Sequence, residues 1–413
     1  MPDLDPVKAQ YESYPYPSRD PEDERERLIV GSPSALDEVR HHVFRGRLNL
    51  KKRFRALVAG GGTGDAAIML AQQLVDAGAK DAELTYLDMS TASRAIVEAR
   101  AKVRGLGNIR FLTGSLLQVA ELAPGPYDYI DCCGVLHHLA EPEAGLAALR
   151  SVLSPQGGMG LMLYAPHGRA GVYPLQGAMS QLADDLPDAE RVALVKKLLD
   201  GLPSNHLFKR NPMLSDHRQS DAHLYDLLLH RRDRAYSVEE MVAFLDSAGL
   251  RPVTWMEPAR YDPTNYLGEA LLKERASNLP MVEAAALAEK LSGTIRTHVC
   301  YVVASGRALP PMDPFADNSV LVLNELDGPA LAAGLRPGVA MTADLEGMKY
   351  RAELPPLAPV LVRIIDGKRS VKSLRKAVSD TLGQPFAKAE FTKQLRALYE
   401  ALHPINKMLV RSV

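Results

Sequence analysis

A short apolar segment, 55–58 (RALV), leads directly into the glycine-rich segment 59–65 (AGGGTGD), and an apolar helical pattern follows over 66–77. A backbone that turns this sharply from strand to helix needs positive φ at some positions, and glycine adopts such angles at little cost. Because the loop lacks side chains, a ligand can also approach its main chain. The sequence therefore predicts a strand, a ligand-binding loop and a helix.

Strands and helices continue to alternate after this loop. The predicted strands cover 55–58, 84–87, 109–112, 127–133, 158–164, 251–255 and 298–304. The predicted helices between them cover 66–77, 90–103, 140–153 and 237–248. Strands joined by helical crossovers lie parallel in a sheet with both faces covered. We therefore expect an α/β fold with a doubly wound, seven-stranded Rossmann-like sheet.

At 413 residues, the chain exceeds what one hydrophobic core usually serves. We expect five consecutive parts. They are an N-terminal arm and helix over 1–55, the ligand-binding core over 56–165, a helical cap over 166–235, the rest of the core with a second insertion over 236–308, and a C-terminal module over 309–413. The module is predicted to be mainly helical, with helices over 357–365, 371–382 and 386–402 and a strand over 407–411.

Polar and glycine residues follow the predicted strands where those strands end. Asp88 ends the second strand, Gly114 and Ser115 the third, and Gly134 the fourth. The carboxyl ends of parallel strands meet at one edge of a sheet, where such folds bind their ligands. A carboxylate at the position of Asp88 can accept both hydroxyls of a ribose. The glycine loop alone would also suit a nicotinamide dinucleotide, so a dehydrogenase stays open at this point.

These segments resemble the class I methyltransferases that use S-adenosylmethionine (SAM). AGGGTG, YLDMS, FLTGSLL and YDYIDCCGVLHHL are similar to four motifs of that family, in the same order. The resemblance implies SAM as cofactor, S-adenosylhomocysteine as product, and a last strand that is antiparallel and inserted beside the sixth. It implies cofactor-binding roles for Gly60, Gly61, Gly62, Gly64, Asp65, Asp88, Met89, Gly114, Ser115, Leu116, Gly134 and His137.

Two positions depart from the family's pattern. Where the family often has an acid before the glycine loop that bonds the methionine part of SAM, this chain has Val58. Asp65 or water is expected to supply the lost polarity. In the adenine-contacting turn, Ser115 stands where the family often has aspartate. A hydroxyl accepts the same hydrogen bond more weakly.

The candidate catalytic residues are His138 and Tyr16. An imidazole with an ordinary pKa near 6.5 can take a proton from a nucleophile, although a packed structural histidine explains His138 equally well. Tyr16 belongs to a stiff Pro-rich arm, and related methyltransferases close such tyrosines over the site. The candidate substrate-binding residues are Tyr14, His230, Tyr261 and Tyr266. Neither a nucleophile triad nor a metal cluster is evident, so no metal is expected.

The methyl acceptor is indicated only by the additional parts of the chain. The cap, with the segment LLLHRRDRAYSVEEMVAFLDSAGL, resembles bacterial protein-lysine methyltransferases with a regulatory insertion. The segment IIDGKRS near the C-terminus resembles winged-helix modules that recognise peptides, which bind by strand addition. Both resemblances favour a nitrogen on a protein or peptide as the acceptor, with lysine as the residue that the first resemblance implies. Two alternatives stay open: a small-molecule O- or N-methyltransferase, and a SAM-binding scaffold without activity.

Composition excludes several other classes. The 49 basic and 50 acidic side chains give a formal net charge of −1, so there is no general field for nucleic acid or an anionic membrane. The three cysteines have neither a disulfide nor a zinc spacing. The N-terminus lacks the apolar stretch of a signal peptide, so we expect a cytoplasmic protein. Oligomerisation stays open.

Overall fold

The computed structural model describes residues 6–336 and 339–412, which form two compact units. The first unit combines Met1–Ala35, Leu50–Arg251 and Gly293–Ser305. The second combines Leu36–Asn49, Pro252–Ser292 and Gly306–Val413. The units therefore interleave along the chain, and the five consecutive parts proposed from the sequence stay a prediction.

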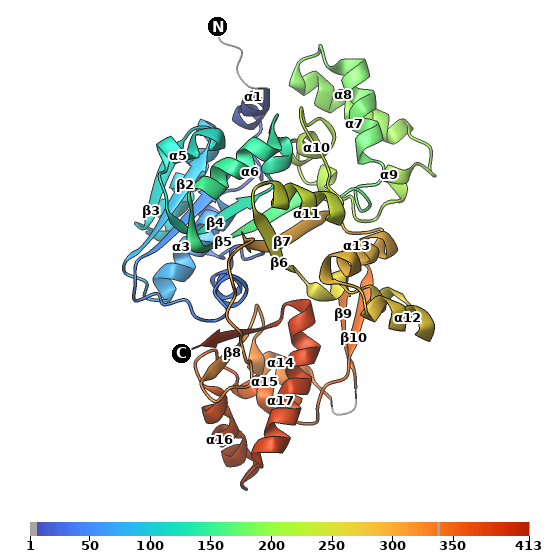
Figure 1. The fold of residues 1–413 in the computed structure, drawn as a ribbon. Coiled ribbons are helices and arrows are strands. Elements are labelled where there is room, and N and C mark those ends of the chain that lie inside the picture. Colours follow the sequence, from blue (N-terminus) through green and yellow to red (C-terminus); the bar gives the residue numbers. More distant parts are fainter. Residues whose placement is uncertain (1–5, 337–338, 413) are drawn as a thin grey trace. The chain divides into compact units, whose positions relative to one another are not determined.

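A seven-stranded sheet has the order β3-β2-β1-β4-β5-β7-β6 (Figure 1), and the first unit contains all of its strands except most of β6, which is assigned to the second unit. Its strands are β1 Phe54–Ala59, β2 Ala82–Asp88, β3 Ile109–Thr113, β4 Tyr127–Cys133, β5 Leu153–Tyr164, β6 Leu250–Trp255 and β7 Thr297–Ala304. The pairs that β1 forms with β2 and β4 are parallel, whereas β7 runs antiparallel to β5. The predicted doubly wound sheet is confirmed, including the antiparallel last strand beside the sixth.

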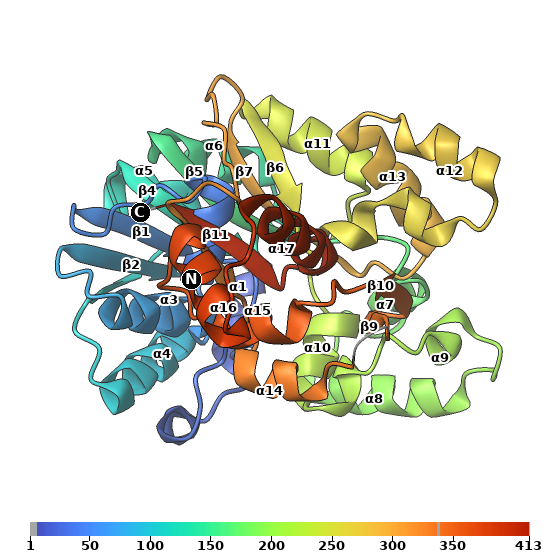
Figure 2. The ribbon, with the colours of Figure 1, turned by 90° about the horizontal axis from the view of Figure 1, so that it is seen from below.

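Helices cover both faces of this sheet (Figure 2), because each parallel crossover is right-handed. On one face, α3 and α4 pack together against β2. On the other face, α6 contacts both α5 and α11. These helices are α3 Asp65–Asp76, α4 Thr91–Arg104, α5 Val119–Leu122, α6 Pro142–Ser151 and α11 Val238–Ser247, with the short η3 Leu116–Gln118 and η4 Leu136–His138. All but α5 and the η turns match predicted helices.

Local chemistry fixes the helix starts that border the sheet. Gly64, at φ +103°, precedes α3, and a Cβ there would lie 2.1 Å from Cγ2 of Val97. Any side chain would thus strain the backbone and force α3 away from α4. Ser90 caps α4 by accepting from the amide of Ser93 at 3.0 Å. The predicted capping box of α11 is present between Ser237 and Glu240.

A group of cap helices follows β5. It comprises α7 Val172–Ala183, α8 Asp188–Gly201, α9 Leu207–Arg210, η5 Asp216–Arg218 and α10 Asp221–Leu228. These helices share an apolar core that includes Val172, Val195 and Leu228. The sequence predicted α7 and α8, but not the shorter α9 and α10, whose apolar faces are too brief to show a helical period.

The N-terminal arm packs on α4 through a buried ion pair. The arm contains α1 Pro6–Ser13 and η1 Pro21–Arg25. Glu24, on η1, accepts hydrogen bonds from Nε and Nη2 of Arg100 at 2.9 and 2.6 Å. The same guanidinium donates to the Thr63 carbonyl at 2.8 Å and to Asp65 at 2.7 Å. Arg100, only 1% exposed, therefore joins the arm, α4 and the glycine loop.

The second unit has its own apolar core, which includes Leu361, Leu374 and Phe391. Its strands are β8 Ser319–Leu323, β9 Met341–Leu345, β10 Met348–Ala352 and β11 Met408–Ser412. Its helices are α2 Leu36–Glu38, η2 Val39–Val43, η6 Pro258–Tyr261, η7 Pro263–Tyr266, α12 Ala270–Ser277, α13 Met281–Ser292, α14 Gly328–Gly334, α15 Ala358–Ile364, α16 Val371–Leu382, α17 Lys388–Leu402 and η8 His403–Ile405.

The sequence predicted α15, α16, α17 and β11 of this unit closely. It missed β8, which pairs antiparallel with the distant β11, and the hairpin β9–β10. The hairpin alternates exposed residues with half-buried or buried ones, so no continuous apolar run marks it in the sequence. The likeness to a winged helix stays a prediction. Within residues 6–336 and 339–412, no helix has both the length and the apolar character to cross a membrane.

We expect Arg100→Met to destabilise the first unit by about 3 kcal/mol, because Glu24 and Asp65 would each lose a buried charge partner, although Arg104 and Arg19 would still pair with them. The measurement is the free energy of unfolding in guanidinium chloride. Arg94→Met is the matched control on α4, since Arg94 makes a half-exposed pair with Glu98, and it should cost under about 1 kcal/mol. Equal losses in the two variants would contradict the role given to Arg100.

Candidate functional site

A cavity of about 480 Å³ lies in the first unit at the carboxyl ends of β1, β2, β3 and β4. Residues from the arm and the cap complete its wall, including Tyr11, Leu214 and Leu227. The residues singled out in the sequence that line it are Tyr16, Gly60, Gly61, Gly62, Asp65, Asp88, Met89, Gly114, Ser115, Leu116, Gly134 and His138. The motifs therefore converge on one space.

Asp88 and the glycine loop lie on the same side of the sheet. One carboxylate oxygen of Asp88 accepts from the Gly62 amide at 2.8 Å, and the other accepts from the Ser90 amide at 2.8 Å. Burial raises the pKa of Asp88 despite these hydrogen bonds. The loop and the acid thus form one continuous edge of the cavity.

The arm closes over the loop through main-chain atoms. The amide of Thr63 donates to the carbonyl of Tyr16 at 3.3 Å, and the Thr63 hydroxyl donates to the carbonyl of Pro17 at 2.7 Å. A Cβ on Gly62 would lie 2.7 Å from the Tyr16 carbonyl oxygen, so only glycine permits this approach. The ring of Tyr16 faces the cavity and meets His223 edge-on at 5.0 Å.

Asp65 is held by two arginines. Its carboxylate accepts from Nη2 of Arg19 at 2.6 Å and from Nη1 of Arg100 at 2.7 Å. Burial opposes ionisation, but the hydrogen bonds and charges of these guanidinium groups outweigh it and lower the pKa of Asp65. The charge of Asp65 is therefore largely balanced before any ligand arrives.

An acid that the sequence analysis missed lies beside Val58. Asp131 on β4 pairs in register with Val58 on β1, and both line the cavity. Its carboxylate accepts from the Ser34 hydroxyl at 2.5 Å, and burial raises its pKa to about 7. The signal available in the sequence was a lone aspartate within the apolar strand YDYIDCC.

A second missed group forms another part of the cavity wall. Asp226, on α10, accepts from the phenol of Tyr11 at 3.2 Å and from the phenol of Tyr164 at 3.0 Å. Asp226 is 5% exposed, and within the described ranges it makes no ion pair with a lysine or arginine. No periodicity could have connected these three residues, because they come from the arm, β5 and the cap.

His138 and His230 stack at 3.7 Å between ring centroids. Nδ1 of His138 lies 2.7 Å from the Arg232 carbonyl, which can only accept, so this nitrogen carries the proton. The Arg232 amide donates to Nδ1 of His230 at 3.0 Å. His138 lines the cavity, whereas His230 lies behind it. The substrate-binding role of His230 stays a prediction.

Five other predicted residues are absent from the described cavity wall. Gly64 starts α3, and His137 is packed against Tyr164 with ring centroids 4.1 Å apart. Tyr14 stacks on Tyr225 of the cap at 5.1 Å. Tyr261 and Tyr266 belong to the second unit, where Tyr261 stacks on Trp255 and the Tyr266 hydroxyl donates to the Arg260 carbonyl.

The chain was compared with known proteins. Residues 57–159 match a family model described as a methyltransferase domain. The uncharacterized protein syc1184_c of Synechococcus sp. is 30% identical over 327 residues, which cover 76% of this chain and 75% of that protein. The tRNA 5-carboxymethoxyuridine methyltransferase of Escherichia coli is 31% identical over 118 residues, 28% of this chain and 42% of that enzyme.

Among solved structures, PKMT2 from Rickettsia typhi in complex with AdoHcy shares the fold, with a TM-score of 0.66 at 12% identity over 92% of this chain and 76% of that one. The chain belongs to the class I SAM-dependent methyltransferases. SAM is the cofactor of this methyltransferase, as its motifs indicated.

The cavity fits SAM in chemistry and in position. The loop with Gly60 and Gly62 and the carboxylate of Asp88 lie side by side on one edge of the cavity, where an adenosyl ligand could contact both. Ser115 lines the same edge, although its hydroxyl accepts from the Leu117 amide at 3.2 Å. Asp131 lies beside Val58 on the neighbouring strand, so its carboxylate is available to the ammonium group of SAM, which Val58 cannot bind. The individual contacts stay predictions.

Asp88→Ala should weaken binding of S-adenosylhomocysteine by about tenfold or more, because hydrogen bonds to a charged group contribute about 1.5–3 kcal/mol. Isothermal titration calorimetry measures the change. Asp81→Ala is the control, since Asp81 is exposed at the opposite end of β2, and its affinity should equal that of the unaltered protein. Unchanged affinity in Asp88→Ala would exclude a ribose contact.

The affinity for SAM should rise by about tenfold between about pH 5.5 and pH 7, because the ammonium prefers the carboxylate form of Asp131 and this form gains population up to its raised pKa. The groups that face Asp131 are the Ser34 hydroxyl and the Cys133 thiol, and burial raises the pKa of that thiol. Asp131→Asn should remove most of the rise. If both proteins showed the same pH dependence of SAM affinity, a group other than Asp131 would be its cause.

Proposed function

We propose that this methyltransferase transfers the methyl group of SAM to an amine nitrogen on a protein or peptide, with the lysine side chain as the foremost acceptor. One observation carries the proposal: the cavity wall contains a buried carboxylate, Asp226, held by two phenols and free of an ion pair in the described part of the chain. A buried charge of this kind is costly unless a ligand compensates it.

An alkylammonium group suits this part of the wall. The rings of Tyr11, Tyr16 and Tyr164 line the same cavity as Asp226. Aromatic faces attract a desolvated cation by about 2 kcal/mol, and the carboxylate adds a charge interaction. Two of the three arginines that line the wall are already engaged with acids: Arg169 pairs with Asp233 at 2.9 Å, and Arg296 lies 3.5 Å from Asp216. The wall therefore suits an anionic acceptor less well than a cationic one.

The residues that the cap and the arm provide to the cavity wall favour an amino-acid side chain as the acceptor. The cap provides Leu214 and Leu227, and the arm provides Val7, to the cavity wall. Apolar walls of this kind exclude water from the methyl donor and leave room for a methylene chain. The resemblance of the cap to protein-lysine methyltransferases, and the fold shared with PKMT2 from Rickettsia typhi, favour the same acceptor class.

When bound, SAM would supply an electrophilic methyl group: an acceptor lone pair would bond to the methyl carbon in line with its C–S bond, and that bond would break to leave the neutral thioether S-adenosylhomocysteine. The glycine loop and Asp88 orient the cofactor from one edge of the cavity. Asp226 and the tyrosines orient the acceptor from another edge. Nδ1 of His138 donates to the Arg232 carbonyl, so in the neutral form of the ring Nε2 is the nitrogen that can take the proton that an ammonium must lose first.

Two alternatives make different predictions in one experiment. Incubation of the protein with SAM carrying a labelled methyl group and a cell lysate should place label in protein bands. Label confined to the small-molecule fraction would favour the small-molecule methyltransferase. SAM binding by calorimetry without any label transfer would favour the scaffold.

Asp226→Asn should lower the initial rate of label transfer into protein by about 30-fold or more, because the loss of one partner of a buried charge pair costs about 2–5 kcal/mol. Asp221→Asn is the matched control, since Asp221 lies on the same helix α10 with a side chain that is 54% exposed, and it should keep the full rate. Equal rates in the two variants would overturn the ammonium-binding role of Asp226.

A further inference from the structure

His137 is buried without a hydrogen-bond partner. His137 is 1% exposed, and neither of its ring nitrogens has a hydrogen-bond partner among the described residues. Oδ1 of Asp233 is also buried and unpartnered, and the Asp233 side chain is 1% exposed. A buried polar atom without a partner costs about 1–3 kcal/mol, so three such atoms in one place require an explanation.

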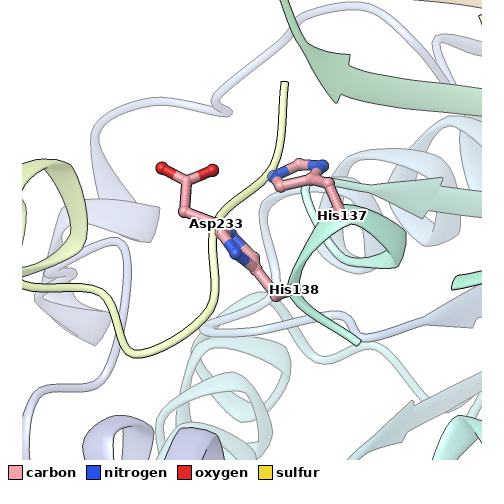
Figure 3. Close-up of side chains that lie close together, drawn as sticks. All are labelled: His137, His138 and Asp233. Carbon is pink, nitrogen blue, oxygen red and sulfur yellow. The ribbon is translucent and has the colours of Figure 1, made fainter. Parts of the chain in front are cut away.

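These atoms converge with a third ligand-type side chain. One atom from each of His137, His138 and Asp233 lies within 4.8 Å of the other two. Figure 3 shows the three side chains meeting from two segments: the histidines from the turn after β4, and Asp233 from the segment that follows α10. The sequence showed no metal spacing because Asp233 is distant from the histidine pair along the chain.

Neighbouring groups already orient two of the three side chains. The Arg232 carbonyl engages Nδ1 of His138 at 2.7 Å, so Nε2 is the ring nitrogen that can offer a lone pair to a metal. Arg169 and Gln176 each donate to Oδ2 of Asp233 at 2.9 Å, which leaves Oδ1 available. Metal-binding histidines characteristically donate their other ring N–H to a carbonyl, and metal-binding carboxylates are likewise hydrogen-bonded by outer neighbours.

We propose that His137, His138 and Asp233 bind one divalent cation of borderline softness, with Zn²⁺ as the first candidate. Two imidazole nitrogens and one carboxylate oxygen are ligands typical of such ions. The cation would satisfy one ring nitrogen of His137 and Oδ1 of Asp233 at once. Three protein ligands leave a further coordination position for water, and the cation reaches the cavity wall at His138.

A second group, His138, Asp226 and His230, also brings ligand-type atoms within 4.8 Å. Its atoms are already engaged, because two phenols donate to Asp226, and Nε2 of His230 lies 3.2 Å from the Tyr11 hydroxyl. Occupation of this group would break those hydrogen bonds. The first group loses none of the hydrogen bonds described above, so the cation belongs there.

The cation changes the role of His138. A nitrogen that donates its lone pair to a metal cannot accept a proton, so the loaded enzyme would not use His138 as its base. The cation site does not depend on the proposed acceptor, which is argued from Asp226. A metal-free protein would therefore leave the amine proposal intact, and loss of amine transfer would leave the metal site intact.

The test is a Zn²⁺ titration of the chelator-stripped full chain, in competition with a chromophoric chelator. The unaltered protein should bind one equivalent. Asp233→Asn and His137→Ala should each weaken binding by about tenfold or more. His167→Ala is the matched control, because His167 is exposed and lies outside the cluster, and it should bind as the unaltered protein does. Circular dichroism melting confirms that each variant is folded.

Two outcomes would overturn the proposal. One is the absence of stoichiometric Zn²⁺ binding by the unaltered protein, and the other is binding that both variants retain in full. If a variant fails to fold, X-ray absorption of the Zn²⁺-loaded unaltered protein decides the matter. A ligand shell with two imidazoles supports the site, and a shell with none excludes it.

Discussion

The hydrogen bonds of the Arg100 guanidinium are the interactions on which the cofactor-binding edge of the cavity depends. Arg100 lies on α4 and binds Glu24 of the arm, the Thr63 carbonyl of the glycine loop and Asp65 at the start of α3. Each partner alone would be an expensive buried polar group, whereas together they compensate one another. The loop, the helix behind it and the arm that covers it are therefore positioned by one side chain.

The sheet and its helices could be predicted from the sequence because their signals are local. Each strand is an apolar run, and each helix has its own cap or period, as at Ser237 and Gly64. The family motifs added the order of the last two strands. Elements that depend on distant pairing could not be predicted in this way, such as β8, which forms a sheet only with β11 at the other end of its unit.

The same contrast holds for the candidate site. Gly60, Gly62 and Asp88 belong to contiguous motifs, and they line the cavity as their spacing indicated. Asp131 was missed because an acid was sought on β1, whereas the fold presents it from the neighbouring strand. Asp226 and Tyr11 were missed for another reason: they meet only through tertiary packing of the cap and the arm. A site that is built from side chains of several distant segments has no recognisable motif in the sequence.

The arm meets the glycine loop with the carbonyl of Tyr16, and this hydrogen bond involves no side chain of the arm. This contact would therefore survive a change of the rings that the arm places at the cavity, although Glu24 and Arg19 of the arm also hold it through their side chains. Gly62 has no such freedom, because its missing Cβ makes room for that carbonyl. A substitution in the rings of the arm could thus alter the cavity wall without displacing the loop, whereas any side chain at position 62 would push the arm away from it.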